Sequence, residues 1–117
     1  MAGRERLICA SDDLVETGRG VRFAVERHGR PEPAFAVRFE GVARAFLNRC
    51  GHLPQQLDWQ EGEFFDDSRL YLICATHGAL YHPGSGACVG GRCAGRGLIA
   101  LPVTEHGGHV YVMEEYE

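Results

Sequence analysis

Cys50-Gly51-His52-Leu53 and Cys74-Ala75-Thr76-His77-Gly78 are the two stretches of this 117-residue chain that decide its fold. Each stretch supplies one thiol and one imidazole, only one or two residues apart. At such short spacings both side chains reach the same ion when the backbone curls around it in a tight turn. The sequence therefore predicts one metal site shared between two loops.

The mixture of ligands within each loop indicates which metal group is bound. Zinc fingers usually place two cysteines in one half of the site and two histidines in the other. A plant-type iron-sulfur ferredoxin uses four cysteines, and replacing two of them by histidines on one iron gives a Rieske [2Fe-2S] centre. One cysteine and one histidine in each loop favour the Rieske centre. A structural zinc site built from the same residues is the alternative.

These motifs carry a family resemblance. Cys50-Gly51-His52, followed by residues 74–81, resembles the double motif of Rieske proteins, and residues 84–91 resemble those of small Rieske ferredoxins. The likeness extends over about residues 47 to 104 and is weak before them.

The resemblance implies one [2Fe-2S] cluster per chain and assigns its ligands. Cys50 and Cys74 would hold one iron, and His52 and His77 would hold the other. Four neighbouring residues would support these ligands: Leu53, Gly78, Ala79 and Tyr81.

The resemblance also bears on the reduction potential. High-potential Rieske proteins carry an extra cysteine in each half of the site, joined as a disulfide, and a serine after the glycine of the second half. Here Gln55, Thr76 and Ala79 occupy those positions, and only Tyr81 matches a hydrogen-bonding residue of that class. Fewer donors to the sulfurs lower the potential, so we expect a value on the order of -150 mV.

Short apolar runs between turn residues predict an all-β fold. The 16 glycines favour strands and turns over helices. The predicted strands cover residues 7–10, 21–26, 34–39, 42–47, 70–73, 79–81, 87–89, 98–104 and 109–113, with a tight hairpin turn at Glu40-Gly41. Pro102 would break or start the strand that contains it, and residues 114–117 are expected to fray.

The resemblance gives these strands an architecture. It implies a single Rieske domain over residues 1–117, an antiparallel β-sandwich or incomplete barrel, with a smaller cluster-binding subdomain over about residues 47–97. The acidic segment near residues 66–69 is interpreted as a small insertion between the two half-sites. The glycine-rich residues 90–97 are expected to approach the cluster closely.

Composition excludes several classes of function. The formal net charge is -4 and no basic cluster is present, which argues against nucleic-acid binding. No signal peptide and no apolar run of ~18 residues is visible, so we expect a cytoplasmic protein that does not bind membranes. No nucleophile and base pair is evident, and the chain is too short for a second catalytic domain. We therefore expect an electron carrier with no catalytic residue, rather than an enzyme.

Three of the five cysteines lie outside the predicted ligand set: Cys9, Cys88 and Cys93. All three are expected to be structural. Cys88 and Cys93 could pair only if the turn at Gly90-Gly91 brings them together, and the sequence leaves this open. His28, His106 and His109 are expected to be solvated turn residues rather than ligands.

Three functions are compatible with these features. The first is a monomeric ferredoxin that carries electrons from a flavin-dependent NAD(P)H reductase to a terminal oxygenase. The second is a small Rieske-like subunit or regulator of a reductase, such as assimilatory nitrite reductase. The third is a zinc-stabilised binding module.

Overall fold

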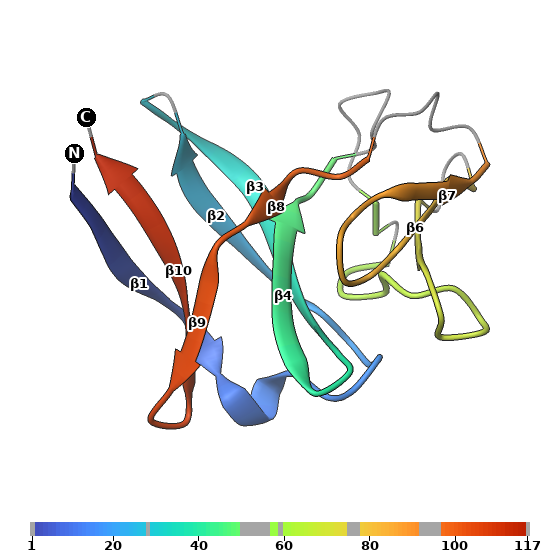
Figure 1. The fold of residues 1–117 in the computed structure, drawn as a ribbon, viewed down its shortest axis with the longest axis horizontal. Coiled ribbons are helices and arrows are strands. Elements are labelled where there is room, and N and C mark those ends of the chain that lie inside the picture. The colour runs from blue at the N-terminus through green and yellow to red at the C-terminus, as the bar shows by residue number, and fades with distance from the viewer. Residues whose placement is uncertain are drawn as a thin grey trace.

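The computed structural model describes residues 2–27, 29–49, 57–58, 60–74, 78–91 and 97–116. These residues form ten strands and one short 3-10 helix, η1 (Figure 1): β1 Ala2–Ala10, η1 Ser11–Asp13, β2 Val21–Arg27, β3 Arg30–Phe39, β4 Val42–Leu47, β5 Leu72–Ile73, β6 Leu80–Tyr81, β7 Cys88–Gly90, β8 Ala100–Leu101, β9 Val103–His106 and β10 His109–Tyr116. The predicted all-β class is confirmed.

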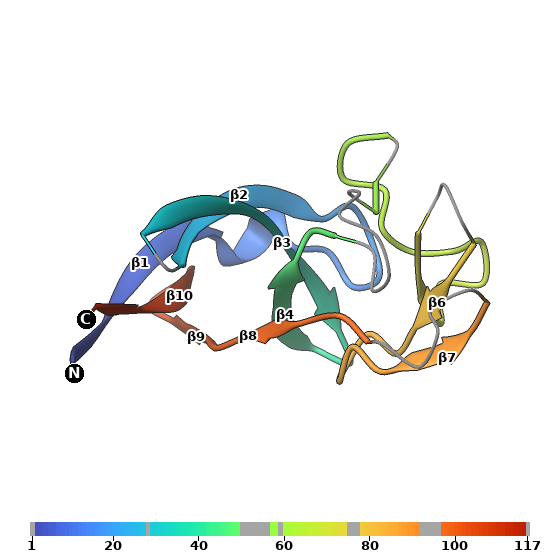
Figure 2. The same cartoon turned by 90° about the horizontal axis from the view of Figure 1, so that it is seen from above.

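The strands form three antiparallel sheets. Their strand orders are β1-β10-β9, β2-β3-β4-β8 and β5-β6-β7. Figures 1 and 2 show the small β5-β6-β7 sheet at one end of the long axis and β1 with β10 at the other. The four-stranded sheet lies between them and contacts both.

Strand β3 is buried on both faces, and its side chains contribute to cores toward both ends of the molecule. Its residues 34–37 are fully buried. Phe35 and Val37 belong to the core beneath the small sheet, whereas Ala34 and Ala36 belong to the cores shared with β10. A continuous apolar run of this kind is typical of a central strand that is covered on both sides.

The predicted hairpin at Glu40-Gly41 is confirmed, and its turn explains its sequence. Phe39 pairs with Val42, which leaves a two-residue loop. Both loop residues have positive φ, 53° for Glu40 and 77° for Gly41. This is the turn that matches the twist of antiparallel strands. The Glu16 carboxylate accepts hydrogen bonds from both loop N–H groups, at 2.6 and 2.8 Å.

Strand boundaries differ from the sequence prediction at two places near the C-terminus. Pro102 divides the predicted strand 98–104 into β8 and β9, which belong to different sheets, as expected for proline in a sheet. The expectation that the chain frays after residue 113 was wrong, because β10 continues to Tyr116 and pairs with β1. Glu114 is buried there and forms an ion pair with Arg6 at 3.0 Å.

No helix among the described residues is long and apolar enough to cross a membrane.

Candidate metal centre

Of the four predicted ligands, only Cys74 is among the described residues. Cys50, His52 and His77 lie outside them, as does the predicted neighbour Leu53. The other predicted neighbours lie within them: Gly78, Ala79 and Tyr81. The geometry of the site is therefore described by the second half-site and by the residues that flank the first.

The second half-site is the loop of a small hairpin between β5 and β6. The Cys74 N–H donates to the Ala79 carbonyl at 2.9 Å, and the Gly78 N–H donates to the Cys74 carbonyl at 2.7 Å. Gly78 has φ +71°, a conformation that glycine adopts without strain. These backbone hydrogen bonds join Cys74 to Gly78 and Ala79, the described residues on either side of His77.

Apolar packing supports this loop from below. Cys74, Ala79 and Tyr81 are each fully buried, in one core with Phe35 and Phe64 of the neighbouring segments. The Phe35 and Phe64 rings stack at a centroid distance of 3.9 Å. A fully buried aromatic pair of this size fixes the loop against the four-stranded sheet.

The glycine-rich segment after β7 lies directly against the second half-site. A Cβ atom on Gly91 would lie 2.6 Å from the Gly78 carbonyl oxygen and 2.8 Å from the Ala79 Cα. Gly91 also has φ +76°. Only glycine fits here, so Gly91 lies against the second half-site. The expected approach of residues 90–97 to the cluster stays a prediction.

The first half-site follows β4 in sequence. A buried polar network connects the residues on its two sides. Asn48 and Asp58 are buried on either side of the loop, 1% and 3% exposed. The Asn48 Oδ1 accepts from the Leu57 N–H at 2.9 Å, and its Nδ2 donates to Asp58 Oδ1 at 3.0 Å. We define these residues together with Arg22 as the loop-base network.

Arg22 of β2 anchors the network to the four-stranded sheet. Its Nε donates to Asp58 Oδ2 at 2.6 Å, and a terminal nitrogen donates to the Asp58 carbonyl at 3.1 Å. The Gly62 N–H also donates to Asp58, at Oδ2 and 2.9 Å. Burial by itself raises the pKa of Asp58, but the hydrogen bonds from Arg22, Asn48 and Gly62 outweigh it and hold this pKa below its usual value.

The loop-base network was not predicted from the sequence. Asn48 and Asp58 are common turn residues, and their spacing matches no motif. The one sequence signal is their position, since they flank the segment that carries Cys50 and His52. Their pairing with Arg22 spans 36 residues and depends on the tertiary fold.

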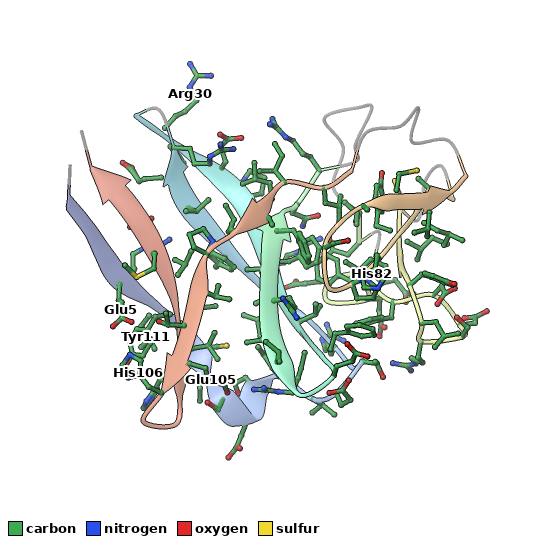
Figure 3. The ribbon with its side chains drawn as sticks, in the orientation of Figure 1. Glu5, Arg30, His82, Glu105, His106 and Tyr111 are labelled. Carbon is green, nitrogen blue, oxygen red and sulfur yellow. The ribbon has the colours of Figure 1, made fainter. Side chains whose placement is uncertain are left out.

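The sequence predicted no role for His82. In the structure its side chain accepts hydrogen bonds from the backbone of a turn. Its Nδ1 accepts from the N–H groups of Gly84 and Ser85, at 3.0 and 3.3 Å. Its ring also meets Phe39 edge-on, with the centroids 5.8 Å apart. His82 therefore caps the turn between β6 and β7, and Figure 3 shows it between the four-stranded sheet and the small sheet.

His106, in the β9–β10 hairpin, lies far from the small sheet and close to Glu5 and Tyr111 (Figure 3). His106 stacks on Tyr111 at 4.6 Å and contacts the Glu5 carboxylate at 3.1 Å. His109 Nδ1 lies 3.1 Å from the Gly107 carbonyl. Both are exposed, as expected. His28 lies outside the described residues.

The cysteines outside the predicted ligand set have separate environments. Cys9 is buried, and burial raises the pKa of its thiol to about 11. Cys88 of β7 is disulfide-bonded and half-buried against the core beneath the small sheet. Whether it pairs with Cys93 lies outside the described residues.

Within the described ranges, no three His, Cys, Asp or Glu side chains form a group that could hold a metal ion. The environment of Cys74, the one predicted ligand among the described residues, nevertheless fits an iron-sulfur cluster. The Cys74 thiol is fully buried in an apolar core. Low water access is one of the features that tune iron-sulfur sites.

Comparison with known proteins gives the fold and the family. The chain resembles the ferredoxin of carbazole 1,9a-dioxygenase from Nocardioides aromaticivorans IC177, with TM-score 0.71, 21% identity and coverage of 95% of this chain and 98% of that one. It resembles a Sphingomonas yanoikuyae B1 ferredoxin with TM-score 0.70, 19% identity and coverage of 96% and 100%.

The same fold occurs as part of a larger protein. The terminal oxygenase of carbazole 1,9a-dioxygenase from Nocardioides aromaticivorans IC177 matches with TM-score 0.71 and 21% identity, covering 97% of this chain and 31% of that one. At these identities the likenesses show the fold alone.

No curated protein matches the chain in sequence. The model of the Rieske [2Fe-2S] domain family matches residues 5–113. The chain therefore belongs to the Rieske [2Fe-2S] domain family, whose cofactor is a [2Fe-2S] cluster.

Proposed function

We propose that this chain is the ferredoxin component of a multicomponent oxygenase, an electron carrier rather than an enzyme. The observation that carries the proposal is the family match over residues 5–113, combined with a fold that matches two ferredoxins over nearly their whole length. A related structure holds an oxidised ferredoxin in complex with a reduced oxygenase. A terminal oxygenase is accordingly the proposed electron acceptor.

The proposed ligands are Cys50 and Cys74 on one iron and His52 and His77 on the other. When bound, the cluster takes up and releases one electron. Cys74 supports this assignment, because its turn is closed by backbone hydrogen bonds and its side chain is fully buried. Gly78, Ala79 and Tyr81 surround that turn, and Leu53 follows the first pair of ligands in sequence.

The organisation of the chain follows from this assignment. Residues 1–117 form one domain, in which residues 47–97 make up the cluster-binding subdomain. The electron donor is a flavin-dependent NAD(P)H reductase. The carrier acts as a monomer in the cytoplasm, where the NAD(P)H pool that feeds such reductases is found. Both partners would approach at His52 and His77, the ligands whose second ring nitrogen can donate a hydrogen bond outward.

Alanine substitution of each ligand tests the cofactor assignment. Cys50→Ala, His52→Ala, Cys74→Ala and His77→Ala should each abolish the cluster and lower stability, because the free energy of metal binding contributes to folding. The measurements are iron and acid-labile sulfide content and the visible spectrum. Cys9→Ser is the matched control, since it changes a buried cysteine in a different core, and it should keep the cluster.

Three outcomes would contradict parts of the proposal. A ligand variant with full iron and sulfide content would remove that residue from the set. A colourless wild-type protein that contains zinc and no sulfide would replace the electron carrier by a zinc-stabilised module. If size-exclusion chromatography of native cell extract always finds the protein in a fixed complex, rather than at 12.9 kDa, the alternative function as a reductase subunit is favoured.

A further inference from the structure

The loop-base network joins the two ends of the first half-site. Asn48 directly follows β4 on the way to Cys50, and Leu57 and Asp58 follow the loop in sequence. Through its two polar atoms the Asn48 amide holds the Leu57 N–H and the Asp58 carboxylate together, at 2.9 and 3.0 Å. Its own N–H donates to the Pro33 carbonyl of β3 at 2.9 Å. The Asn48 side chain thus joins the two ends of the loop, and its backbone N–H ties them to β3.

The described residues at the ends of the two half-sites are joined by different kinds of contact. The second loop, residues 74–79, is closed by hydrogen bonds between its own backbone groups. In the described residues that flank the first loop, the closing contacts come from the side chains of Asn48 and Asp58, with Arg22 behind them. Side-chain substitution at Asn48 or Asp58 can therefore alter the contacts at the ends of the first loop.

Burial makes these contacts specific. The Asp58 side chain is fully buried, whereas Arg22 is 36% exposed. A buried carboxylate needs partners for both oxygens, and here each oxygen has at least one. Hydrogen bonding fixes the orientation of the Asn48 amide, because its Oδ1 faces an N–H group and its Nδ2 faces a carboxylate. Any other orientation would place two donors or two acceptors together.

We infer that Asn48 and Asp58 are positioning residues for the first half-site, which set the conformation of the loop carrying Cys50 and His52 and thereby the retention and electronic properties of the cluster. The inference rests on the proposed function. Neither residue is a ligand of the cluster. They act through the ends of the loop, as outer hydrogen-bond partners do at other metal sites.

Exchanging the two side chains provides the test. Asn48→Asp keeps the acceptor for the Leu57 N–H but sets a second carboxylate against Asp58. Asp58→Asn can keep an oxygen toward the donors of Arg22 and Gly62, but its amide nitrogen then faces the Asn48 Nδ2, donor against donor. The double variant Asn48→Asp/Asp58→Asn restores a matching pattern, because the carboxylate introduced at position 48 faces the Leu57 N–H and the amide introduced at position 58.

The control is a buried carboxylate far from the site. Glu114 is 2% exposed in its side chain, pairs with Arg6 at 3.0 Å and accepts from the Glu26 N–H at 3.0 Å. It lies on β10, at the opposite end of the long axis from the small sheet (Figure 1). Glu114→Gln therefore weakens a comparable network without touching the loop.

Three measurements separate positioning from stability: the rate of iron loss to a chelator under native conditions, the electron paramagnetic resonance spectrum of the reduced protein and the urea midpoint. Each single variant should lose iron about tenfold faster or more, the range seen when outer hydrogen bonds of metal sites are removed. Their spectra should change, and the double variant should move both properties back toward wild type. Glu114→Gln should lower only the urea midpoint.

A milder variant keeps the test decisive if the single variants at positions 48 and 58 do not fold. Arg22→Lys retains the charge but cannot donate to the Asp58 carboxylate and carbonyl together. It should shift the iron-loss rate and the spectrum in the same direction, by less.

Two results would overturn the inference. The first is wild-type iron loss and a wild-type spectrum in folded variants of Asn48, Asp58 or Arg22, since a purely structural network would change only the urea midpoint. The second is a folded double variant that recovers neither property. Wild-type protein without iron and sulfide would instead overturn the proposed function, and this inference with it.

Discussion

Ala79 and Tyr81 are single residues that bear on the reduction potential. Both are fully buried beside the turn that carries Cys74. Water therefore does not replace a hydrogen bond that is gained or lost when one hydroxyl group is added or removed there. Hydrogen bonds to cluster sulfurs stabilise the more negative, reduced state and raise the potential.

We predict that the wild-type potential lies on the order of -150 mV, the lower end of the range for Rieske centres. Ala79→Ser should raise it by adding a donor, and Tyr81→Phe should lower it slightly by removing one. A potentiometric titration followed by visible absorbance measures all three. A wild-type value above about +100 mV would contradict both the donor count and the ferredoxin assignment.

At the scale of elements, the segment after β7 is fitted to the second half-site through Gly91. Its backbone passes so close to Gly78 and Ala79 that a Cβ atom would overlap them. Gly29, in the β2–β3 turn, has a similar φ of +78°, but a Cβ atom there would meet nothing within 4 Å. The two glycines therefore share a backbone conformation and differ in their surroundings.

We predict that Gly91→Ala destabilises the protein more than Gly29→Ala. The left-handed conformation alone should cost about 1–2 kcal/mol at either position. At Gly91 the overlap adds to that cost and displaces the second half-site, so the variant should also lose iron faster. Urea unfolding and chelator assays measure the two effects. Equal behaviour of the two variants would mean that the segment moves away without consequence for the site.

At the scale of the whole molecule, the loop-base network links stability to pH. The folded-state pKa of Asp58 is held below its usual value, so the carboxylate stabilises the fold while it is ionised. That contribution is present above the unfolded pKa of about 3.9 and is lost as pH falls through the lower folded pKa.

We predict that Asp58→Asn lowers the unfolding free energy by about 2 kcal/mol at pH 7, between the values for exposed and buried pairs. The difference from wild type should shrink as the pH falls from about 5 to 2, because wild type loses its advantage there. Urea titrations across this range measure it. A difference that is constant with pH would show that the charge of Asp58 contributes nothing.

Net charge is the other property of the whole molecule with a measurable consequence. At -4, the chain should be steered toward a partner with a basic patch. The rate of its reduction by the native reductase should therefore fall as ionic strength rises, because salt screens long-range attraction. Stopped-flow measurements over a salt series test this. A flat dependence would exclude steering by net charge.

The sequence by itself determined the features that depend on neighbouring residues. Cys-x-His and Cys-x-x-His spacings indicated the kind of metal group, and alternation and the turn at Glu40-Gly41 predicted most of the described strands within a few residues. These signals are local, since a strand period or a tight turn is a property of a few consecutive residues.

Only the tertiary structure decided the contacts between distant segments. Arg22 meets Asp58 across 36 residues, and Gly91 meets Gly78 because β6 and β7 pair side by side. The end of β10 is ordered by pairing with β1, at the other end of the chain. Asparagine, aspartate and glycine are common in any loop, so their roles here arise from strand register and packing, which no short stretch of sequence encodes.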